Sequence, residues 1–593
     1  MAENEPALIK VASSAQAGEA AFTLQYKNRF LYSKYNPQKS VMQAIQNLEL
    51  LPETLVLAFS PALFYGYKEL KEKCQAAKSD FLCVEADPLL HAFESQEIIR
   101  QDLAAPLLPL DKNNPQGLND FFNGSPKKFR RVIRLDLSAG ASLAPGFYKS
   151  FFECAQNIVA AFWKNRLTLV RLGRLYSKNL FKNLPLAASS TPFEALEGTV
   201  EKPILVCGAG ESLDELTAFA REKSQKAQEG AAEIKQTFFT LAVDAAVPAL
   251  SAAGIKIDAI AATESQWAIE KAYIGLAQGQ KCGQDSGPFF FFDLTSRPQI
   301  ARRFYKNSAF YFSEFDNNIF LSRLAKNSLL PKIAPPLGSI GLTAVYLALL
   351  LRKNDSVPVY VTGLDFSFSA GRTHALSSAQ SKALSLLSNR LYPAQNLAAA
   401  FGPGSQKLFG KDGRPVWTTK NLSAYAALFK DYFKGAKNLY DAGKSGLELG
   451  LDKASLLGVL NDEKSKKAAA SNDLGLSSHA AASNGFGFAN AAGPCADTER
   501  VQKVRQFLEQ ELCDLRALAD LLSKGDSSKF RDKNISLDEQ ISRSLSGREY
   551  LYLHFPDGSA PSLERSFLTR VRSQIDFFCK DIETALAFAA EQI

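Results

Sequence analysis

Strand and helix signals alternate between Lys202 and Asp365. Short apolar runs such as PILVC and PFFFF are each followed by a glycine or an acid, and then by a helical stretch. This alternation predicts an α/β fold, in which helices cover a parallel sheet. Because the strands of a parallel sheet all end at one edge, the polar residues that follow them are expected to gather there, where ligands bind.

The chain has 593 residues, which is too long for a single hydrophobic core. A weaker strand-helix alternation near the N-terminus predicts a Rossmann-like domain over residues 1–190. The stronger alternation predicts a central α/β domain over residues 195–455. Residues 456–498 are rich in Ala, Ser, Asn and Gly and are expected to form a linker. Apolar residues at helical spacing predict a helical C-terminal domain over residues 499–593.

Composition narrows the classes of function. The net charge is +8, and no long stripe of Lys and Arg is present, so nucleic acid is not an expected partner. The longest apolar run, Thr343–Leu351, is too short to span a membrane, and the first residues do not form a signal peptide. Eight cysteines without a Cys-x-x-Cys pair indicate free thiols, so we expect a cytoplasmic protein.

Two glycine loops are candidate phosphate sites. In CGAGESLDEL, Gly208 and Gly210 let the backbone approach a ligand, and Ser212 offers a hydroxyl at the start of a helix. In PLGSIGLTAVYLA, the same roles fall to Gly338, Ser339 and Thr343. The alternatives are a tight strand-to-helix turn for the first loop and a capped helix for the second. If both loops bind phosphate or sugar groups, a nucleotide ligand is indicated.

Four acids stand at expected strand ends: Asp244, Glu264, Asp293 and Asp365. Their carboxylates could bind sugar hydroxyls or a metal ion, although acids in these places are often ordinary loop residues. No two aspartates stand two residues apart, so the sequence has no Asp-x-Asp metal motif and no metal site is predicted. A nucleotide-sugar enzyme of this kind would stabilise its leaving phosphate with amides, hydroxyls and Arg.

The stretch YVTGLDFSFSAGRTHA brings an acid and a histidine to one strand end. His374 is one of four histidines, and its imidazole could act as a general base, with Asp365 in the same site. Arg372 is near enough to offer charge to a phosphate. The alternative is that His374 is an ordinary surface histidine. In the N-terminal domain, Ala58, Ser60 and Ala62 replace the glycines of a nucleotide loop, so no cofactor is expected there.

Seven stretches resemble the motility-associated factor (Maf) family of bacterial flagellin glycosyltransferases, whose central domain is of the MptE-like, DUF115 type. They occur in family order over roughly residues 25–450: FLYSKYNPQKSV, RLYSKNLFKNLP, LVCGAGESLD, GIKIDAIAATES, PLGSIGLTAVYLAL, VYVTGLDFSFSAGRTHA and NLYDAGKSGLELG. The family's Gly-x-Asp and Thr-His-Ala pattern is present as Gly363, Asp365 and Thr373–Ala375.

The resemblance implies a central domain similar to bacterial sialyltransferases. It implies transfer of a nonulosonic acid, a nine-carbon sialic-acid-like sugar, from a CMP donor to Ser or Thr of flagellin. The donor is then a substrate, and no separate cofactor is expected. Two alternatives stay open. One is a 6-hydroxymethylpterin pyrophosphokinase, which would use ATP and Mg²⁺ held by Asp244, Glu264 or Asp365. The other is a flagellin-binding export factor without catalysis.

Overall fold

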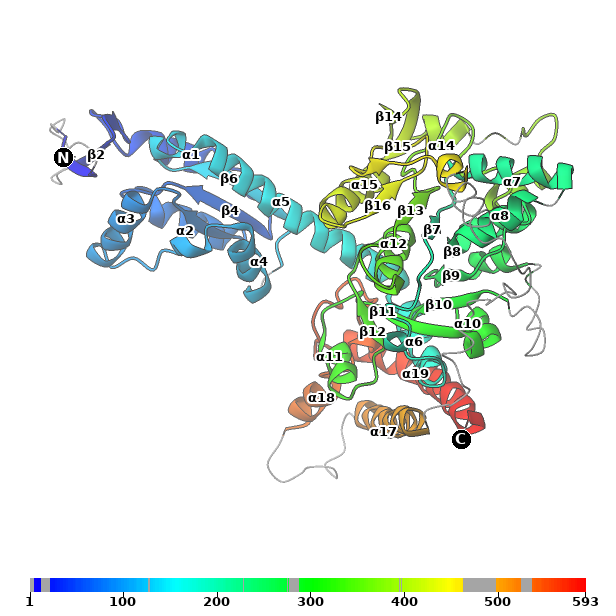
Figure 1. Ribbon diagram of the computed structural model, residues 1–593. Helices are drawn as coiled ribbons and strands as arrows, with labels where there is room; N and C mark the ends of the chain where they lie inside the picture. Colours follow the sequence, from blue (N-terminus) through cyan, green and yellow to red (C-terminus); the bar gives the residue numbers. More distant parts are fainter. Residues whose placement is uncertain are drawn as a thin grey trace. The chain divides into compact units, whose positions relative to one another are not determined.

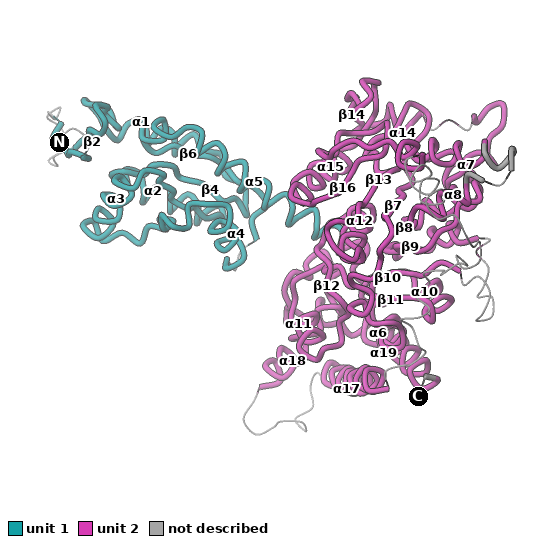
Figure 2. The backbone as a smooth tube through the Cα atoms, viewed as in Figure 1, with its two compact units in different colours: residues 1–168 teal, residues 169–593 magenta. Residues whose placement is uncertain are grey.

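The computed structural model describes residues 5–11, 22–125, 128–227, 229–274, 276, 287–393, 395, 397–461, 498–523 and 536–592. The chain divides into two compact units, unit 1 (Met1–Thr168) and unit 2 (Leu169–Ile593) (Figure 2). Each unit has its own parallel sheet, which confirms the predicted α/β class.

Unit 1 is built on a three-stranded parallel sheet in the order β5-β4-β6 (Figure 1). Its strands are β4 (Thr54–Phe59), β5 (Asp80–Val84) and β6 (Arg131–Asp136), and its helices are α1 (Lys39–Gln46), α2 (Tyr67–Ala76), α3 (Pro88–Arg100), α4 (Pro115–Gly124) and α5 (Pro145–Thr168). A small antiparallel sheet precedes them, made of β1 (Ala7–Lys10), β2 (Phe22–Tyr26) and β3 (Arg29–Phe30). Every residue of β4 is buried, as expected for the central strand of a Rossmann-like sheet.

The turn after β4 carries Ser60 and Ala62 where glycines would be expected. Both residues have positive φ angles, 49° and 46°, a conformation that side chains disfavour. The N–H of Ala62 donates a hydrogen bond of 2.7 Å to the buried carboxylate of Glu94. A carboxylate of the chain itself therefore lies where the amides of a nucleotide-binding turn would face a phosphate.

Unit 2 contains a nine-stranded sheet in the order β12-β11-β10-β9-β8-β7-β13-β16-β17, and all neighbouring strands are parallel. The strands are β7 (Ile204–Cys207), β8 (Phe239–Val243), β9 (Ala259–Ala262), β10 (Phe289–Asp293), β11 (Ser308–Ser313), β12 (Lys332–Ala334), β13 (Val359–Thr362), β16 (Leu439–Asp441) and β17 (Asp452–Lys453). The strand order reverses between β7 and β13, and such a reversal opens a crevice at the carboxyl ends of the two strands.

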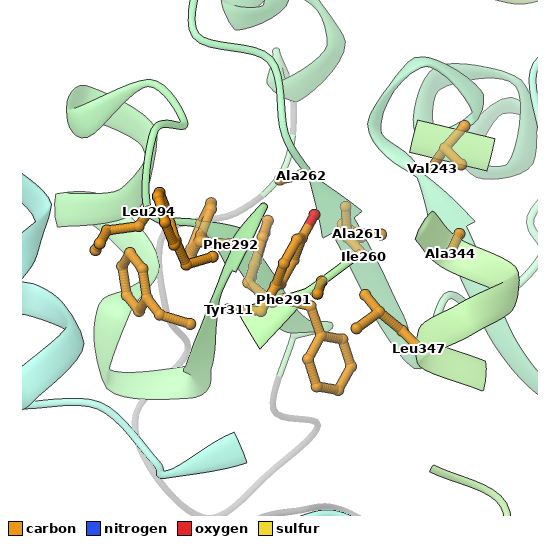
Figure 3. Packing of buried hydrophobic residues seen from close by; sticks show 14 of the residues in the cluster. Val243, Ile260, Ala261, Ala262, Phe291, Phe292, Leu294, Tyr311, Ala344 and Leu347 are labelled. Atoms are coloured by element: carbon orange, nitrogen blue, oxygen red, sulfur yellow. The ribbon is translucent and has the colours of Figure 1, made fainter. Parts of the chain in front are cut away.

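Helix α12 (Ile340–Leu351) packs against the sheet beside this reversal, on β7, β8, β9 and β13. Its Ala344 and Leu347 lie in the same core as Ile260 and Phe291 (Figure 3). The central strands are buried throughout, which explains why they read in the sequence as continuous apolar runs.

The other helices of unit 2 flank this sheet or follow it. They are α6 (Arg174–Ala188), α7 (Leu213–Ala227), α8 (Glu229–Thr237), α9 (Val247–Ala252), α10 (Pro298–Phe304), α11 (Ile319–Lys326), α13 (Ala379–Leu387), α14 (Leu397–Phe401), α15 (Lys420–Phe433), α17 (Thr498–Ser523), α18 (Leu537–Leu545) and α19 (Arg565–Gln592). A hairpin of β14 (Ser405–Phe409) and β15 (Pro415–Thr419) lies between α14 and α15. None of the described helices is long and apolar enough to cross a membrane.

The helical C-terminal region is confirmed, but it shares one core with the central sheet. Phe181 of α6 contacts the rings of Tyr550 and Phe578, at centroid distances of 5.0 and 6.0 Å. This packing also places α6 in unit 2, so the first compact unit ends at Thr168 and not at the expected residue 190. Most of the expected linker, residues 462–497, lies outside the described residues.

Candidate functional site

The first glycine loop, which follows β7, packs against the loop that follows β13. The N–H groups of Gly208 and Gly210 donate to the carbonyls of Thr362 and Gly363, over 2.7 and 2.8 Å. A Cβ atom on Gly208 would overlap the carbonyl oxygen of Gly363. The glycines therefore allow two neighbouring loops to touch backbone to backbone.

The start of α7 is already occupied by a carboxylate. The N–H of Ser212 donates to Asp365 Oδ2 over 2.8 Å, and its hydroxyl donates to Asp365 Oδ1. The same hydroxyl accepts from the N–H of Gly363 over 2.8 Å. Burial raises the pKa of Asp365 to about 6, while the Ser212 hydrogen bonds act in the opposite direction. Asp365 thus stands where a phosphate at this loop would be expected, and its predicted catalytic role stays a prediction.

A buried ion pair, which sequence reasoning missed, completes this cluster. The ammonium group of Lys411 lies 2.8 and 2.6 Å from the two carboxylate oxygens of Asp441, and both side chains are almost fully buried. A Cβ on Gly446 would lie 2.6 Å from the Cα of Asp365. The stretch NLYDAGKSGLELG, which resembles the Maf family, could have indicated this packing, because its glycines follow a strand that ends in an acid.

His374 lies on a loop that is fixed to the first glycine loop. The N–H of Ala375 donates to the carbonyl of Ala209 over 2.9 Å. The imidazole is half-buried, with Nδ1 at 3.0 Å from the hydroxyl of Thr373, and burial lowers the pKa of His374. Asp365 and the chain at His374 therefore meet the same loop, and a shared catalytic site for the two side chains stays a prediction.

Arg372 forms ion pairs with two carboxylates. Its guanidinium lies 3.1 Å from Glu211 and 2.8 Å from Asp214. Glu211 also accepts from the N–H of Ser369 over 2.5 Å, and Asp214 from the N–H of Leu376 over 2.9 Å. These contacts tie the His374 loop to the start of α7, so the charge of Arg372 is largely balanced within the chain.

The second glycine loop leads into an open helix N-terminus. Gly338 has a φ of +69°, and a Cβ there would lie 3.0 Å from the ring of Tyr425. Ser339 is the N-cap residue of α12, but its side chain makes no capping bond. Within the described residues, the N–H groups of residues 340–342 have no hydrogen-bond acceptor. This helix start therefore offers three amides and one hydroxyl to a ligand.

Two further contacts show how the first turn of α12 is stabilised and which part of the sheet it lies next to. The N–H and hydroxyl of Thr343 donate to the carbonyl of Ser339, over 3.1 and 3.2 Å, so Thr343 stabilises the first turn of the helix. A Cβ on Gly341 would lie 2.5 Å from a side-chain carbon of Leu364, which follows β13. The start of α12 therefore adjoins the strand reversal between β7 and β13.

The remaining strand-end acids differ in exposure. Asp244 is buried, accepts from the N–H of Ala245 over 2.7 Å, and has a pKa that burial raises to about 7. Glu264 is exposed and accepts from the N–H of Gln266 over 2.9 Å. Asp293 is buried and its oxygens accept from Thr295 and from the next strand. Of these acids, Glu264 is the one that can reach a ligand.

Two tyrosines, which the sequence analysis did not single out, lie near the second loop. Burial, followed by the charges of Glu264 and Asp293 and by Tyr425, raises the pKa of Tyr176 to about 12. Tyr425 also faces Gly338, and both tyrosine rings are half-buried. Tyr176 belongs to the stretch RLYSKNLFKNLP, and its resemblance to the Maf family is the signal that could have found it.

Helix α6 holds Tyr176 across the ends of β9 and β10. The side-chain amide of Asn179 donates to the carbonyls of Ser265 and Thr295, over 3.3 and 2.9 Å. Asn183 donates in the same way to Leu294 and Ser296, over 3.0 and 2.8 Å.

Among the residues that the structure describes, no group of three or more His, Cys, Asp or Glu side chains is arranged to hold a metal ion.

Comparisons with known proteins bear on the central region and on the whole chain. Residues 178–371 match the family described as 6-hydroxymethylpterin diphosphokinase MptE-like. The solved structure of the MAf glycosyltransferase from Magnetospirillum magneticum AMB-1 is similar, with a TM-score of 0.48 and 14% identity, over 99% of this chain and 90% of that one. An uncharacterized protein of Treponema pallidum (strain Nichols) is 31% identical over 570 residues, which cover 94% of this chain and 93% of the relative.

The match over residues 178–371 confirms the MptE-like domain that the resemblance to the Maf family implied. The chain belongs to one family with the Treponema pallidum protein, and it carries an MptE-like domain in the larger of its two units.

Proposed function

We propose that the protein is an O-glycosyltransferase, which moves a nonulosonic acid from a CMP donor to Ser or Thr of flagellin in the cytoplasm. The observation that carries the proposal is the open start of α12 beside the strand reversal. Its free amides and the uncapped Ser339 hydroxyl form a site for one anionic group. The resemblance of seven sequence stretches to the Maf family supplies the donor and the acceptor.

A single phosphate site suits a CMP-sugar. In this donor one phosphate joins the nucleoside directly to the anomeric carbon of the sugar, so the leaving group carries one phosphate. At the other glycine loop, the Asp365 carboxylate would repel a second phosphate. Gly338 and Ser339 would bind the phosphate, and Tyr176, Tyr425 and Glu264 would contact the nucleoside or the sugar.

The reaction needs one base and one stabilised leaving group. The acceptor hydroxyl oxygen forms a bond to the anomeric carbon as the bond from that carbon to the phosphate oxygen breaks, through an oxocarbenium-like state. The electron pair of the broken bond leaves with CMP, where the amides of α12 stabilise its charge. His374 takes the hydroxyl proton, and its lowered pKa keeps the imidazole neutral and ready to accept at pH 7.

The pyrophosphokinase alternative is less well supported. That reaction would require carboxylates with free oxygens to hold Mg²⁺ against ATP. Both oxygens of Asp365 accept from Ser212, and Asp244 is buried against its own turn, so Glu264 is the one exposed carboxylate among these three acids. The third alternative, a flagellin-binding factor without catalysis, would give the half-buried His374 no chemical role.

The decisive experiment incubates the full chain with flagellin and a CMP-nonulosonic acid and weighs the flagellin by mass spectrometry. Transfer that persists in EDTA is the expected result. Transfer that needs Mg²⁺, or formation of a pterin diphosphate from ATP and 6-hydroxymethylpterin, would replace the proposal with the pyrophosphokinase. Flagellin that binds but gains no mass would favour the non-catalytic factor.

A further inference from the structure

The segment that follows His374 exposes an unusual number of large apolar side chains. Six of them are between 68% and 87% exposed: Leu386, Leu387, Leu391, Tyr392, Phe401 and Phe409. They lie on α13, on α14, on β14 and on the chain between the two helices, and we call them the apolar insert surface. Soluble proteins rarely gather exposed apolar groups in this way unless the surface binds a partner.

The segment that carries this surface, residues 375–409, is called the insert, and it is anchored to the fold on both sides of His374. It begins directly after His374, and its first residues are held by hydrogen bonds from Ala375 to Ala209 and from Leu376 to Asp214. It returns to the same loop at α14, because a Cβ on Gly371 would lie 3.6 Å from a side-chain carbon of Leu397. A partner on this surface is therefore brought next to His374.

The α14 end of the insert is joined to the hairpin. Helix α14 lies beside β14 and packs on it (Figure 1). The ring of Phe401 lies 5.6 Å from that of Trp417 on β15. The helix and the hairpin form a supported platform on which Phe401 and Phe409 remain exposed.

The exposed charged side chains on the insert and directly after it indicate what kind of partner this surface can bind. Between residues 376 and 420, the exposed charged side chains are five bases, Lys382, Arg390, Lys407, Arg414 and Lys420, and one acid, Asp412. A partner that covers this surface should carry apolar and acidic side chains. A second copy of this chain in a symmetric contact would set the basic surface against itself, which like charges disfavour.

We propose that the apolar insert surface binds the protein acceptor, at a segment that carries apolar and acidic side chains near the Ser or Thr that receives the sugar. This inference rests on the proposed function and adds to it the place where the acceptor docks. It also gives a reason for the exposed apolar groups on the segment that begins directly after the proposed base.

The test compares kinetics with flagellin for the wild-type chain, the double variant Leu386→Asp/Leu387→Asp and the variant Phe409→Asp. The altered side chains are exposed, so the fold should persist. We expect KM for flagellin to rise at least about ten-fold, while CMP binding by calorimetry stays within about two-fold. Leu563→Asp is the matched control, because Leu563 is an exposed leucine on a loop outside the insert, and it should leave KM unchanged.

The outcomes separate the two proposals. If the wild-type chain transfers no sugar to flagellin, the proposed function fails and this inference fails with it. If the wild-type chain transfers sugar and both insert variants keep the wild-type KM, the inference alone is overturned. It is also overturned if the variants lose self-association in light scattering, or binding to vesicles of anionic lipid, while their KM for flagellin stays the same.

Discussion

The two glycine loops of unit 2 look alike in sequence but differ in the structure. The loop after β7 is closed, because its glycines touch the loop after β13 and its helix start binds Asp365. The loop before α12 is open, because its N-cap serine makes no capping bond and its first amides face no acceptor among the described residues. A helix N-terminus attracts an anion in either case. What differs is whether the chain itself supplies that anion.

The comparison separates residues that build the site from residues that would bind the ligand. On the closed side, Gly208, Ser212 and Asp365 hold loops together, and changes there should reduce stability first. On the open side, Gly338 and Ser339 should affect ligand affinity first. His374 belongs to neither loop, although its own loop docks on the closed one.

The largest effect is expected at His374, which lies outside both loops and which we propose is the general base. His374→Ala should lower the transfer rate by about 10²–10⁴-fold, the usual contribution of a general base. CMP binding should persist, because the loop is docked through the backbone of Ala375. Rates with a radiolabelled donor and calorimetry with CMP check the two statements.

The pH profile gives an independent check on His374. Because burial lowers the pKa of His374 below its ordinary value of 6.5, the wild-type rate should stay high down to that pH and decline on further acidification. The variant His374→Ala should lack this decline. If the variant transfers sugar as fast as the wild type, another group is the base.

Gly208 tests the closed loop. Gly208→Ala should lower the free energy of unfolding by about 3 kcal/mol, because the new methyl group overlaps the backbone of Gly363, which cannot move aside. Urea unfolding of the full chain measures the loss. Gly435→Ala is the control, since a Cβ at Gly435 meets nothing within 4 Å, and it should change stability by less than about 0.5 kcal/mol. Equal effects of the two variants would mean that the loops do not pack as described.

Asp365 should make the free energy of unfolding depend on pH. Its pKa is about 6 in the folded chain and 3.8 in the reference state, so the protonated form suits the fold better. This stabilisation is complete below pH 3.8 and is lost as the pH rises through about 6. Asp365→Asn is neutral at every pH and lacks the loss, which amounts to about 3 kcal/mol over the full titration. Unfolding free energies of both proteins at pH 5 and pH 8 should therefore diverge, and a constant difference would contradict the assignment.

The smallest effects are expected from removing the serine hydroxyl of each loop, and these two variants compare the loops most directly. Ser339→Ala should weaken CMP binding by about five- to ten-fold and leave stability nearly unchanged, because its hydroxyl makes no capping bond. Ser212→Ala should do the reverse, with a loss of about 1 kcal/mol in stability and CMP affinity within about two-fold. Thermal unfolding and calorimetry measure both. If Ser212→Ala weakens CMP binding more than Ser339→Ala does, the open and closed loops have been exchanged.

Much of the fold could be read from local pattern. The run Phe289–Asp293 is buried along its whole length, as its continuous apolar sequence predicted, and the strongest strand-helix alternation lies within the MptE-like region, residues 178–371. Strand-end acids also appeared where they were expected. Phe181, by contrast, packs on Tyr550 and Phe578, and no local pattern in the sequence pairs a helix near residue 180 with helices beyond residue 498.

The sequence by itself determined the class of fold, the edge of the sheet at which polar groups gather, and the two loops with glycine at a helix start. These depend on hydrophobic periodicity and turn chemistry, which act over a few residues. Only the tertiary structure decided which loop is open. The carboxylate that fills the start of α7 comes from Asp365, 153 positions along the chain from Ser212, and it arrives there because β13 pairs with β7. Whether a helix N-terminus is free for a ligand depends on which distant side chain the fold brings to it. The local spacing of residues does not predict such a long-range contact.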